Sequence, residues 1–503
     1  MDNGPWYSKQ EGSPLKLSRN ASITSPRRMD NSELKLVREY NSQVSIPEHQ
    51  ILSFDHLLDE INFGKFQYWI YGIMALMSIS EGAQITIFTL MVPILKNEWH
   101  ISDSLNSLQA SFVFVGYLVG SMLSGQLADR VGRKKPFLIS SFFTCLLSLG
   151  TIACQEIYSL LIVRALLGIL VGLFAPCGVT MISEITPGHL RGRYMGLITL
   201  TFAIGQLFGL LVAEFTLISL DEGNWRLLTF WCCLPGFLAW FISLFRLRES
   251  PRFALLSGQK NLAYNIIEEM IQSNKSSIQF NDEMKIKLSN WTHAMNRIAK
   301  NQKNASITSL FENNRFFLTI LIWFNWFILS FVYYGIVLLL PDILSHIEQT
   351  QTGRDKIIQL VVSCISDILG AVAAAFFIEL KGFGRKNSLI IFFTIQALTA
   401  LMGFYDIEHR FIYWATASKF FLSMTFIFSF QYTAEVYPTK IRTTGIGMAN
   451  GIGRLGGVIM PWICMYMNSK QLRSPFVLFS VLSVITSFSN CFLPFETLGK
   501  ELE

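Results

Sequence analysis

The chain has 503 residues, of which 51% are hydrophobic and only 15% charged, with a net charge of +6 and a mean hydropathy of +0.40. Soluble globular domains carry about 25% charged residues, so this composition excludes an ordinary soluble enzyme. Segments of about 20 apolar residues can cross a bilayer as helices, and the charges of this chain lie mainly between such segments. The sequence therefore predicts an all-α integral membrane protein.

The first 62 residues are polar and rich in Ser, Asn and basic residues, which predicts a mostly disordered tail. Within the tail, Ile51 to Ile61 has the pattern of a short amphipathic helix that can lie on the membrane surface. Twelve apolar spans follow, at 66–95, 104–127, 136–154, 157–181, 194–218, 225–246, 315–341, 356–380, 388–405, 411–433, 443–467 and 474–494.

Most of the 41 Lys and Arg residues fall on one side of these spans. Because basic loops stay in the cytoplasm, we expect both termini and the loop 247–314 to be cytoplasmic. The predicted domains are a tail at 1–62, a six-helix bundle at 63–246, a central loop with short helices at 247–314, a second six-helix bundle at 315–494 and a tail at 495–503. The expected location is the plasma membrane or an intracellular vesicle membrane.

The eight cysteines all lie in apolar spans, and their spacing suggests neither a metal site nor a disulfide framework. The sequence also has no nucleophile–base constellation. We therefore expect no enzymatic activity, no metal and no cofactor, and a monomer with no nucleic-acid partner.

An internal repeat divides the chain into two halves. The pattern E-x-x-P-x-x-x-R begins at Glu184 and again at Glu435, and G-R-K begins at Gly132 and again at Gly384, each with an offset of about 250 residues. We therefore predict two pseudo-symmetric six-helix bundles, an architecture typical of secondary transporters.

The repeated motifs also carry a resemblance. The stretch GQLADRVGRKK at 125–135 is similar to the G-x-x-x-D-R-x-G-R-K signature of the major facilitator superfamily. EITPGHLRG, RESPRF and LPFETLGKEL resemble further signatures of its sugar and organic-ion branches. DEINFGKFQ and AEVYPTKIRTTGIGMANGIGRLGG resemble the synaptic-vesicle-glycoprotein-related subgroup, near organic cation and nicotinate transporters.

The resemblance implies a gate built from charged residues. Asp129 ends the second span, where its carboxylate can face the N-terminus of the eleventh helix near Thr443, while Arg133 can pair with Asp129 or Glu184. The alternative is that these bases only fix membrane topology. The predicted gating residues are Asp129, Arg130, Arg133, Glu184, Arg191, Glu379, Arg385, Glu435 and Arg442. In the second half, two extra residues separate Glu379 from the G-R-K motif, which predicts a looser connector.

Six charged residues lie inside the spans: Glu81, Arg164, Glu214, Asp367, Lys419 and Arg454. Such charges are costly unless they face a partner or a wet cavity. Glu81 is the first candidate for proton coupling, with Arg164, or for pairing with a cationic substrate, and the alternative is a structural ion pair with Arg164 or Arg454. The resemblance implies a second acid three residues after Glu81, where this chain has Gln84.

The remaining substrate-binding candidates are polar groups that avoid lipid. The predicted substrate-binding residues are Glu81, Gln84, Asn325, Tyr333, Tyr334, Asp367, Asn450 and Arg454. For Asp367, a substrate contact and a structural pair remain equally open.

Together these observations predict a transporter that moves a small organic ion across the bilayer by alternating access, with protons as a possible coupling ion. The alternative is a transport-inactive vesicle-membrane receptor or nucleotide-binding interaction protein, because Gln84 replaces the second acid.

Overall fold

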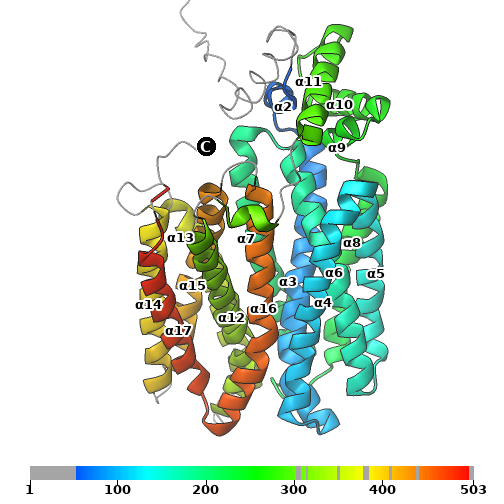
Figure 1. Cartoon of the computed structure of the whole chain (residues 1–503). Coiled ribbons are helices and arrows are strands. Elements are labelled where there is room, and N and C mark those ends of the chain that lie inside the picture. Colours follow the sequence, from blue (N-terminus) through cyan, green and yellow to red (C-terminus); the bar gives the residue numbers. More distant parts are fainter. Residues whose placement is uncertain are drawn as a thin grey trace, which may run out of the picture.

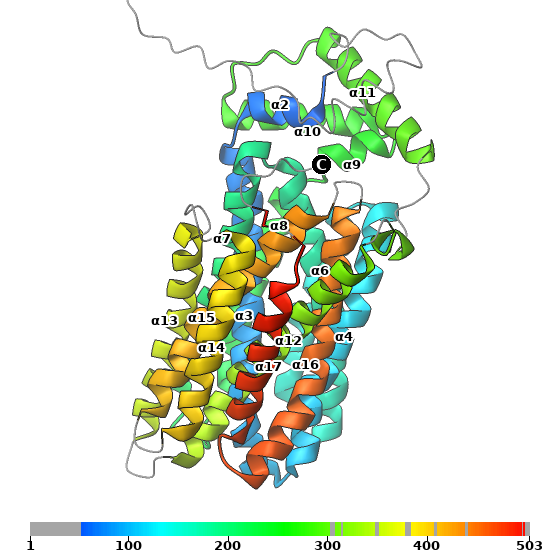
Figure 2. The ribbon, with the colours of Figure 1, turned by 60° about the vertical axis from the view of Figure 1, so that its left-hand side comes forward.

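A computed structural model describes residues 52–301, 307–312, 315–347, 352–377, 384–406, 410–437, 441–494 and 496–497. These residues form helices joined by turns and loops, and none of them forms a β-strand (Figures 1 and 2). The predicted disorder of the first 51 residues lies outside the described part of the chain.

Twelve long helices form the body of the molecule, as predicted. They are α3 (Lys65–Trp99), α4 (Asp103–Val131), α5 (Lys134–Gly150), α6 (Ile157–Ile185), α7 (Gly188–Thr216), α8 (Trp225–Arg246), α12 (Phe316–Ile347), α13 (Gly353–Phe377), α14 (Arg385–Tyr405), α15 (Phe411–Val436), α16 (Arg442–Lys470) and α17 (Ser474–Cys491). Among the described residues, eleven helices are long and apolar enough to span a membrane. The exception is α16, whose glycines, Asn450 and Arg454 make it less apolar than the rest.

The helices pack as two bundles, α3 to α8 and α12 to α17, and three helix pairs make the main contacts between the bundles. These pairs are α3 with α12, α4 with α16, and α7 with α13. In the C-terminal bundle α12 is central, because it contacts α13, α15, α16 and α17. The site described below lies where these facing helices meet.

Glycines let α4 and α6 approach more closely than other residues would allow. A Cβ atom added to Gly116 would lie 2.2 Å from the carbonyl oxygen of Ala165, and one added to Gly168 would lie 2.2 Å from that of Val113. The close approach of these two helices therefore depends on residues without a side chain.

Four further helices form a cap at one end of the bundles (Figures 1 and 2). These cap helices are α2 (Phe54–Ile61), α9 (Pro251–Leu256), α10 (Lys260–Asn274) and α11 (Asp282–Asn301). We call this end of the molecule the cap side and the opposite end the far side. The short helix η3 (Ile307–Leu310) contacts α16, so the central loop reaches both bundles.

The prediction that the helix near Ile51 to Ile61 lies on the membrane surface is wrong. The apolar face of α2 is buried in the cap, with the Phe54 ring 6.1 Å from that of Trp291. On its polar face, Asp55 lies 2.9 Å from Arg191 and 3.3 Å from Arg252. The predicted amphipathic helix is present, but protein rather than lipid covers its apolar face.

We predict that Gly116→Ala destabilises the protein by about 1–3 kcal/mol, because the new methyl group forces α4 and α6 apart. The thermal unfolding midpoint of the purified protein in one detergent measures this effect. Gly125→Ala is the matched control, since it lies on the same helix and an added Cβ meets no atom within 4 Å. Equal midpoints for the two variants would contradict the role given to Gly116.

Candidate functional site

A cavity lies between the two bundles and receives side chains from both. It is lined by Glu81, Gln84, Ile85, Phe88, Val113, Phe114, Tyr117, Thr144, Arg164, Leu167, Gly168, Val171, Phe202, Tyr334 and Arg454. The cavity has a volume of about 50 Å³ in this conformation, which a few water molecules can fill.

Arg454 of α16 reaches across the cavity from the C-terminal bundle to the N-terminal one. Its guanidinium carbon lies 3.8 Å from the centre of the Tyr117 ring of α4, a cation–π arrangement. Its Nη1 donates a hydrogen bond of 2.6 Å to the hydroxyl of Tyr334, whereas its Nε has no hydrogen-bond partner among the described residues. Tyr117 was missed by sequence reasoning, because an aromatic residue in an apolar span carries no distinctive signal.

The other two charges of the cavity are less well satisfied. Arg164 is only 2% exposed, yet its Nη2 faces the sulfur of Met91 at 3.1 Å and its Nε lacks a partner in the described structure. Glu81 forms no ion pair within 4.0 Å among the described residues. The alternative of a structural pair between Glu81 and either arginine is therefore not realised in this conformation.

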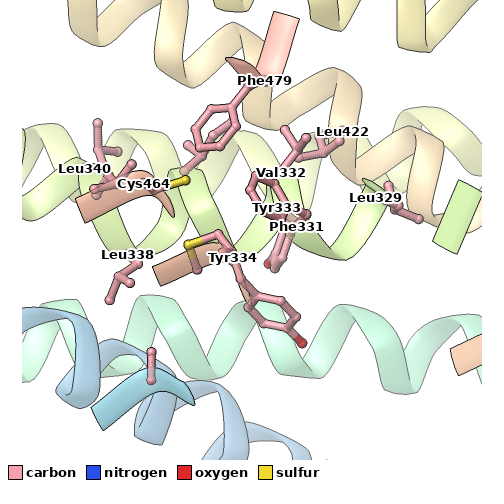
Figure 3. Close-up of a cluster of buried hydrophobic side chains, with 14 of the residues drawn as sticks. Leu329, Phe331, Val332, Tyr333, Tyr334, Leu338, Leu340, Leu422, Cys464 and Phe479 are labelled. Carbon is pink, nitrogen blue, oxygen red and sulfur yellow. The ribbon is translucent and has the colours of Figure 1, made fainter. Parts of the chain in front are cut away.

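Of the remaining substrate-binding candidates, Gln84 and Tyr334 line the cavity and the others do not. Figure 3 shows the Tyr334 side chain pointing away from Phe479 and Leu422 in the packed C-terminal bundle. Its neighbour Tyr333 accepts a 3.1 Å hydrogen bond from Gln206 of α7 and so joins the bundles beside the cavity.

Asn325 and Asn450 lie outside the cavity lining. Asn325 donates to Asn490 at 2.9 Å and accepts from Ser429 at 3.2 Å, at a separate small pocket of about 10 Å³ within the C-terminal bundle. Asn450 lies one turn before Arg454 on α16. The structure thus separates the predicted substrate-binding residues into a group that lines the cavity and a group that lies outside the cavity lining.

Asp367 is paired inside the C-terminal bundle rather than exposed to the cavity. Its carboxylate lies 2.8 Å from the Lys419 ammonium, and both side chains are at most 5% exposed. This geometry favours the structural pair over the substrate contact that the sequence left equally open.

The repeated motifs fold into two matching clusters on the cap side. Arg133 contacts Glu184 at 3.1 Å, and its backbone N–H donates to Glu249 at 2.8 Å. In the other bundle Arg385 contacts Glu435 at 3.1 Å, and its backbone N–H donates to Glu496 at 2.6 Å.

Glu249 and Glu496 were not among the predicted gating residues, although the stretches RESPRF and LPFETLGKEL contain them. Each sits at the N-terminus of a helix, α5 or α14, where a carboxylate is favoured. The preceding glycines have positive φ angles, 97° at Gly132 and 62° at Gly384, and an added Cβ would lie within 2.5 Å of a glutamate side-chain atom. The glycine of G-R-K therefore makes room for Glu249 and Glu496.

The contacts described for the other predicted gating residues lie within one bundle or reach the cap. Asp129 is 75% exposed and lies 3.4 Å from Arg133, with no hydrogen bond or ion pair to the described residues of α16. Arg191 binds Asp55 of the cap, and Arg442 donates to the backbone of its own loop at Tyr437. Arg130 is exposed, and Glu379 lies outside the described residues.

Direct contacts between the bundles lie instead toward the far side. Glu214 of α7 forms an ion pair with Arg354 of α13. A Cβ added to Gly353 would lie 2.5 Å from the carbonyl oxygen of Ile218, and Ser111 donates a 2.8 Å hydrogen bond to Val458. The far side is therefore closed, while the motif clusters of the cap side stay within their own bundles.

Two six-helix bundles around a charged central cavity define a multi-pass membrane transporter of the major facilitator type rather than an enzyme. The family profile described as "Sugar (and other) transporter" matches residues 61–503. The chain belongs to this family.

Similar proteins include transporters named for niacin and for xylose. The synaptic vesicle 2-related protein of Rattus norvegicus is 26% identical, over 91% of this chain and 83% of its own length. The niacin transporter NiaP of Acinetobacter baylyi is 25% identical, over 89% of this chain and 98% of its own. The partially occluded inward-open structure of the xylose transporter XylE from E. coli has a TM-score of 0.67 at 18% identity, covering 87% of this chain and 100% of that one.

We predict that Lys419→Met destabilises the protein by about 3–5 kcal/mol, because it leaves the Asp367 carboxylate buried without its partner. The double variant with Asp367→Leu should recover most of this loss, since neither charge remains. Thermal unfolding midpoints of the purified variants measure both effects. A double variant as unstable as the single one would contradict a purely structural pair.

Proposed function

We propose that this protein is a secondary active transporter that moves a small organic ion through the central cavity by alternating access. The observation that carries the proposal is the cavity itself, in which Glu81, Arg164 and Arg454 face one space without direct ion pairs among them. Charged groups inside a membrane are retained where they face a substrate or ion pathway. A small-molecule ion could complete the contacts that the protein leaves open.

The contacts between the bundles support alternating access. With the far side closed, the exposed carboxylate of Asp129 is available to meet α16 when the bundles rock together at the cap side. Because basic residues are concentrated at the cap side, we propose that this side and both termini face the cytoplasm. The transporter works as a monomer, in the plasma membrane or a vesicle membrane.

Protons are the proposed coupling ion, and Glu81 is the proposed carrier. Its carboxylate lines the cavity with Arg164 and Arg454 but forms no direct ion pair with either among the described residues, so a proton can bind and leave as the cavity changes access. Substrate binding changes the electrostatic field at this carboxylate, which links proton movement to substrate movement. The structurally similar XylE is described as a proton:xylose symporter.

The second candidate is a transport-inactive membrane receptor or nucleotide-binding interaction protein. The observation that favours it is Gln84, an amide at the position where the resemblance implies a second acid. Reconstituted flux of organic ions, with and without a pH gradient, separates the two candidates.

We predict that Glu81→Gln abolishes accumulation driven by a pH gradient while exchange of substrate across the membrane continues, because the variant cannot take up the coupling proton. Proteoliposomes loaded with labelled organic ions measure both activities. Glu222→Gln, an exposed far-side carboxylate, is the matched control and should accumulate like the wild type. Full pH-driven accumulation by Glu81→Gln would remove Glu81 from the coupling mechanism.

We also predict that breaking the ion pair between Glu214 and Arg354 favours opening of the far side. In a protein freed of its native cysteines, Val113→Cys places a thiol in the cavity lining. Adding Arg354→Gln should raise its labelling from the far side by up to about fivefold, since an exposed ion pair contributes up to about 1 kcal/mol. The swap Glu214→Arg with Arg354→Glu should restore slow labelling, and unchanged rates in all variants would show that this pair does not hold the far side shut.

A further inference from the structure

The cavity has an excess of positive charge whatever the state of Glu81. Two guanidinium groups, of Arg164 and Arg454, and one carboxylate are the ionisable acid and base groups among the lining residues. With Glu81 ionised the formal charge is +1, and with Glu81 protonated it is +2. The nearby Asp367 cannot offset this charge, because its carboxylate is already neutralised by Lys419 at 2.8 Å.

Arg454 is held in a way that leaves its hydrogen-bonding edge available. The stack on Tyr117 occupies a face of the guanidinium, and the contact to Tyr334 uses a single nitrogen. Guanidinium N–H groups point outward in the plane of the group, in the fork geometry that matches a carboxylate. The Nε atom has no partner among the described residues, so the donor set is incomplete without a ligand.

Arg164 supplies a second positive group with a poor protein partner. A thioether sulfur is a weak acceptor, and the Met91 sulfur at 3.1 Å is the hydrogen-bond acceptor that the described structure gives this guanidinium. The Phe88 ring at 5.7 Å adds only a cation–π contact. A nearly fully buried arginine without an ion pair is costly, so an anion that enters the cavity gains a favourable contact with Arg164.

Aromatic side chains form a large part of the remaining walls, together with aliphatic residues such as Ile85 and Leu167. Phe88, Phe114, Tyr117 and Tyr334 all line it, and the rings of Phe114 and Tyr334 lie 4.5 Å apart from opposite bundles. Flat apolar walls of this kind accommodate a ring or another planar group by stacking.

From these observations we infer that the transported substrate is a small organic anion, a planar or aromatic carboxylate whose carboxylate group binds Arg454 with Arg164 as the second positive group. This inference rests on the proposed function, because it takes the central cavity as the substrate site. A cation is disfavoured because two guanidinium groups would repel it and a single carboxylate would attract it.

Three probes that share a phenyl ring but differ in charge test the inference: benzoate is an anion, benzamide is neutral and benzylammonium is a cation. Binding to the purified protein is measured by calorimetry and by the shift of the thermal unfolding midpoint, both of which are independent of transport. We expect benzoate to bind and to stabilise the protein at millimolar concentration, with benzamide and benzylammonium showing no shift. Benzylammonium binding as tightly as benzoate, or no benzoate binding, would overturn the inference.

Two cavity variants change benzoate affinity in opposite directions. Arg454→Gln should weaken binding by about tenfold or more, and Glu81→Gln should strengthen it several-fold by removing a repelling charge. Arg246→Gln, an exposed arginine outside the cavity lining, is the matched control and should bind like the wild type. Arg454→Lys keeps the charge without the planar fork and should fall between wild type and Arg454→Gln.

Weaker benzoate binding by Glu81→Gln would show that the Glu81 carboxylate supports binding instead of repelling the anion, and would overturn the anion assignment. If Arg454→Gln does not fold, the opposite response of Glu81→Gln still decides the outcome. Charge-selective benzoate binding without any flux would refute the proposed function and leave the anion site standing. Flux of organic cations with no anion binding would support the proposed function and refute the anion site.

Discussion

The cost of placing ionic side chains inside a membrane is the constraint on which the arrangement of this protein depends. A charge at the bilayer centre costs several kcal/mol unless it has a partner or faces a polar cavity. The chain meets this constraint in two ways. Asp367 and Lys419 neutralise each other inside the C-terminal bundle, whereas Glu81, Arg164 and Arg454 lie around a shared cavity between the bundles. The first arrangement suits a fixed scaffold, and the second leaves charge available for a ligand.

Rigid halves are what allow such a cavity to open alternately to either side. The cluster of Arg133, Glu184 and Glu249 ties helix ends together within one bundle. A matching cluster around Arg385 and Glu435 does the same in the other. Because these contacts stay inside each bundle, motion is directed to the interface between the bundles, where contacts are fewer. The cap helices add further contacts on one side only, through Asp55 of α2.

Several elements of this organisation could be predicted from the sequence. Continuous apolar segments determine the membrane helices, because the bilayer requires about 20 such residues per span. The G-R-K and E-x-x-P-x-x-x-R motifs recur at nearly the same offset along the chain. They predict two similar halves, because the same motif in the same place between two helices forms the same local structure. Glu81, Arg164 and Arg454 were identifiable as candidates for a site, because a charge in an apolar segment is conspicuous.

The roles of individual charges depended on distances that periodicity does not encode. For Asp367 the sequence left a substrate contact and a structural pair equally open, and the 2.8 Å distance to Lys419 favours the pair. The sequence did not distinguish Tyr117 from the many other aromatic residues, and only the structure shows its ring stacked against the Arg454 guanidinium. The amphipathic pattern of α2 predicted an apolar face but could not say whether lipid or protein covers it.

The sequence by itself determined the number and position of the membrane helices, the two-fold repeat and the set of intramembrane charges, because each of these follows from local composition. Only the tertiary structure decided which charges pair, which line the cavity and which side is closed. The physical reason is that electrostatic interactions act between residues far apart in the chain, and their strength depends on distances that exist only once the helices have packed.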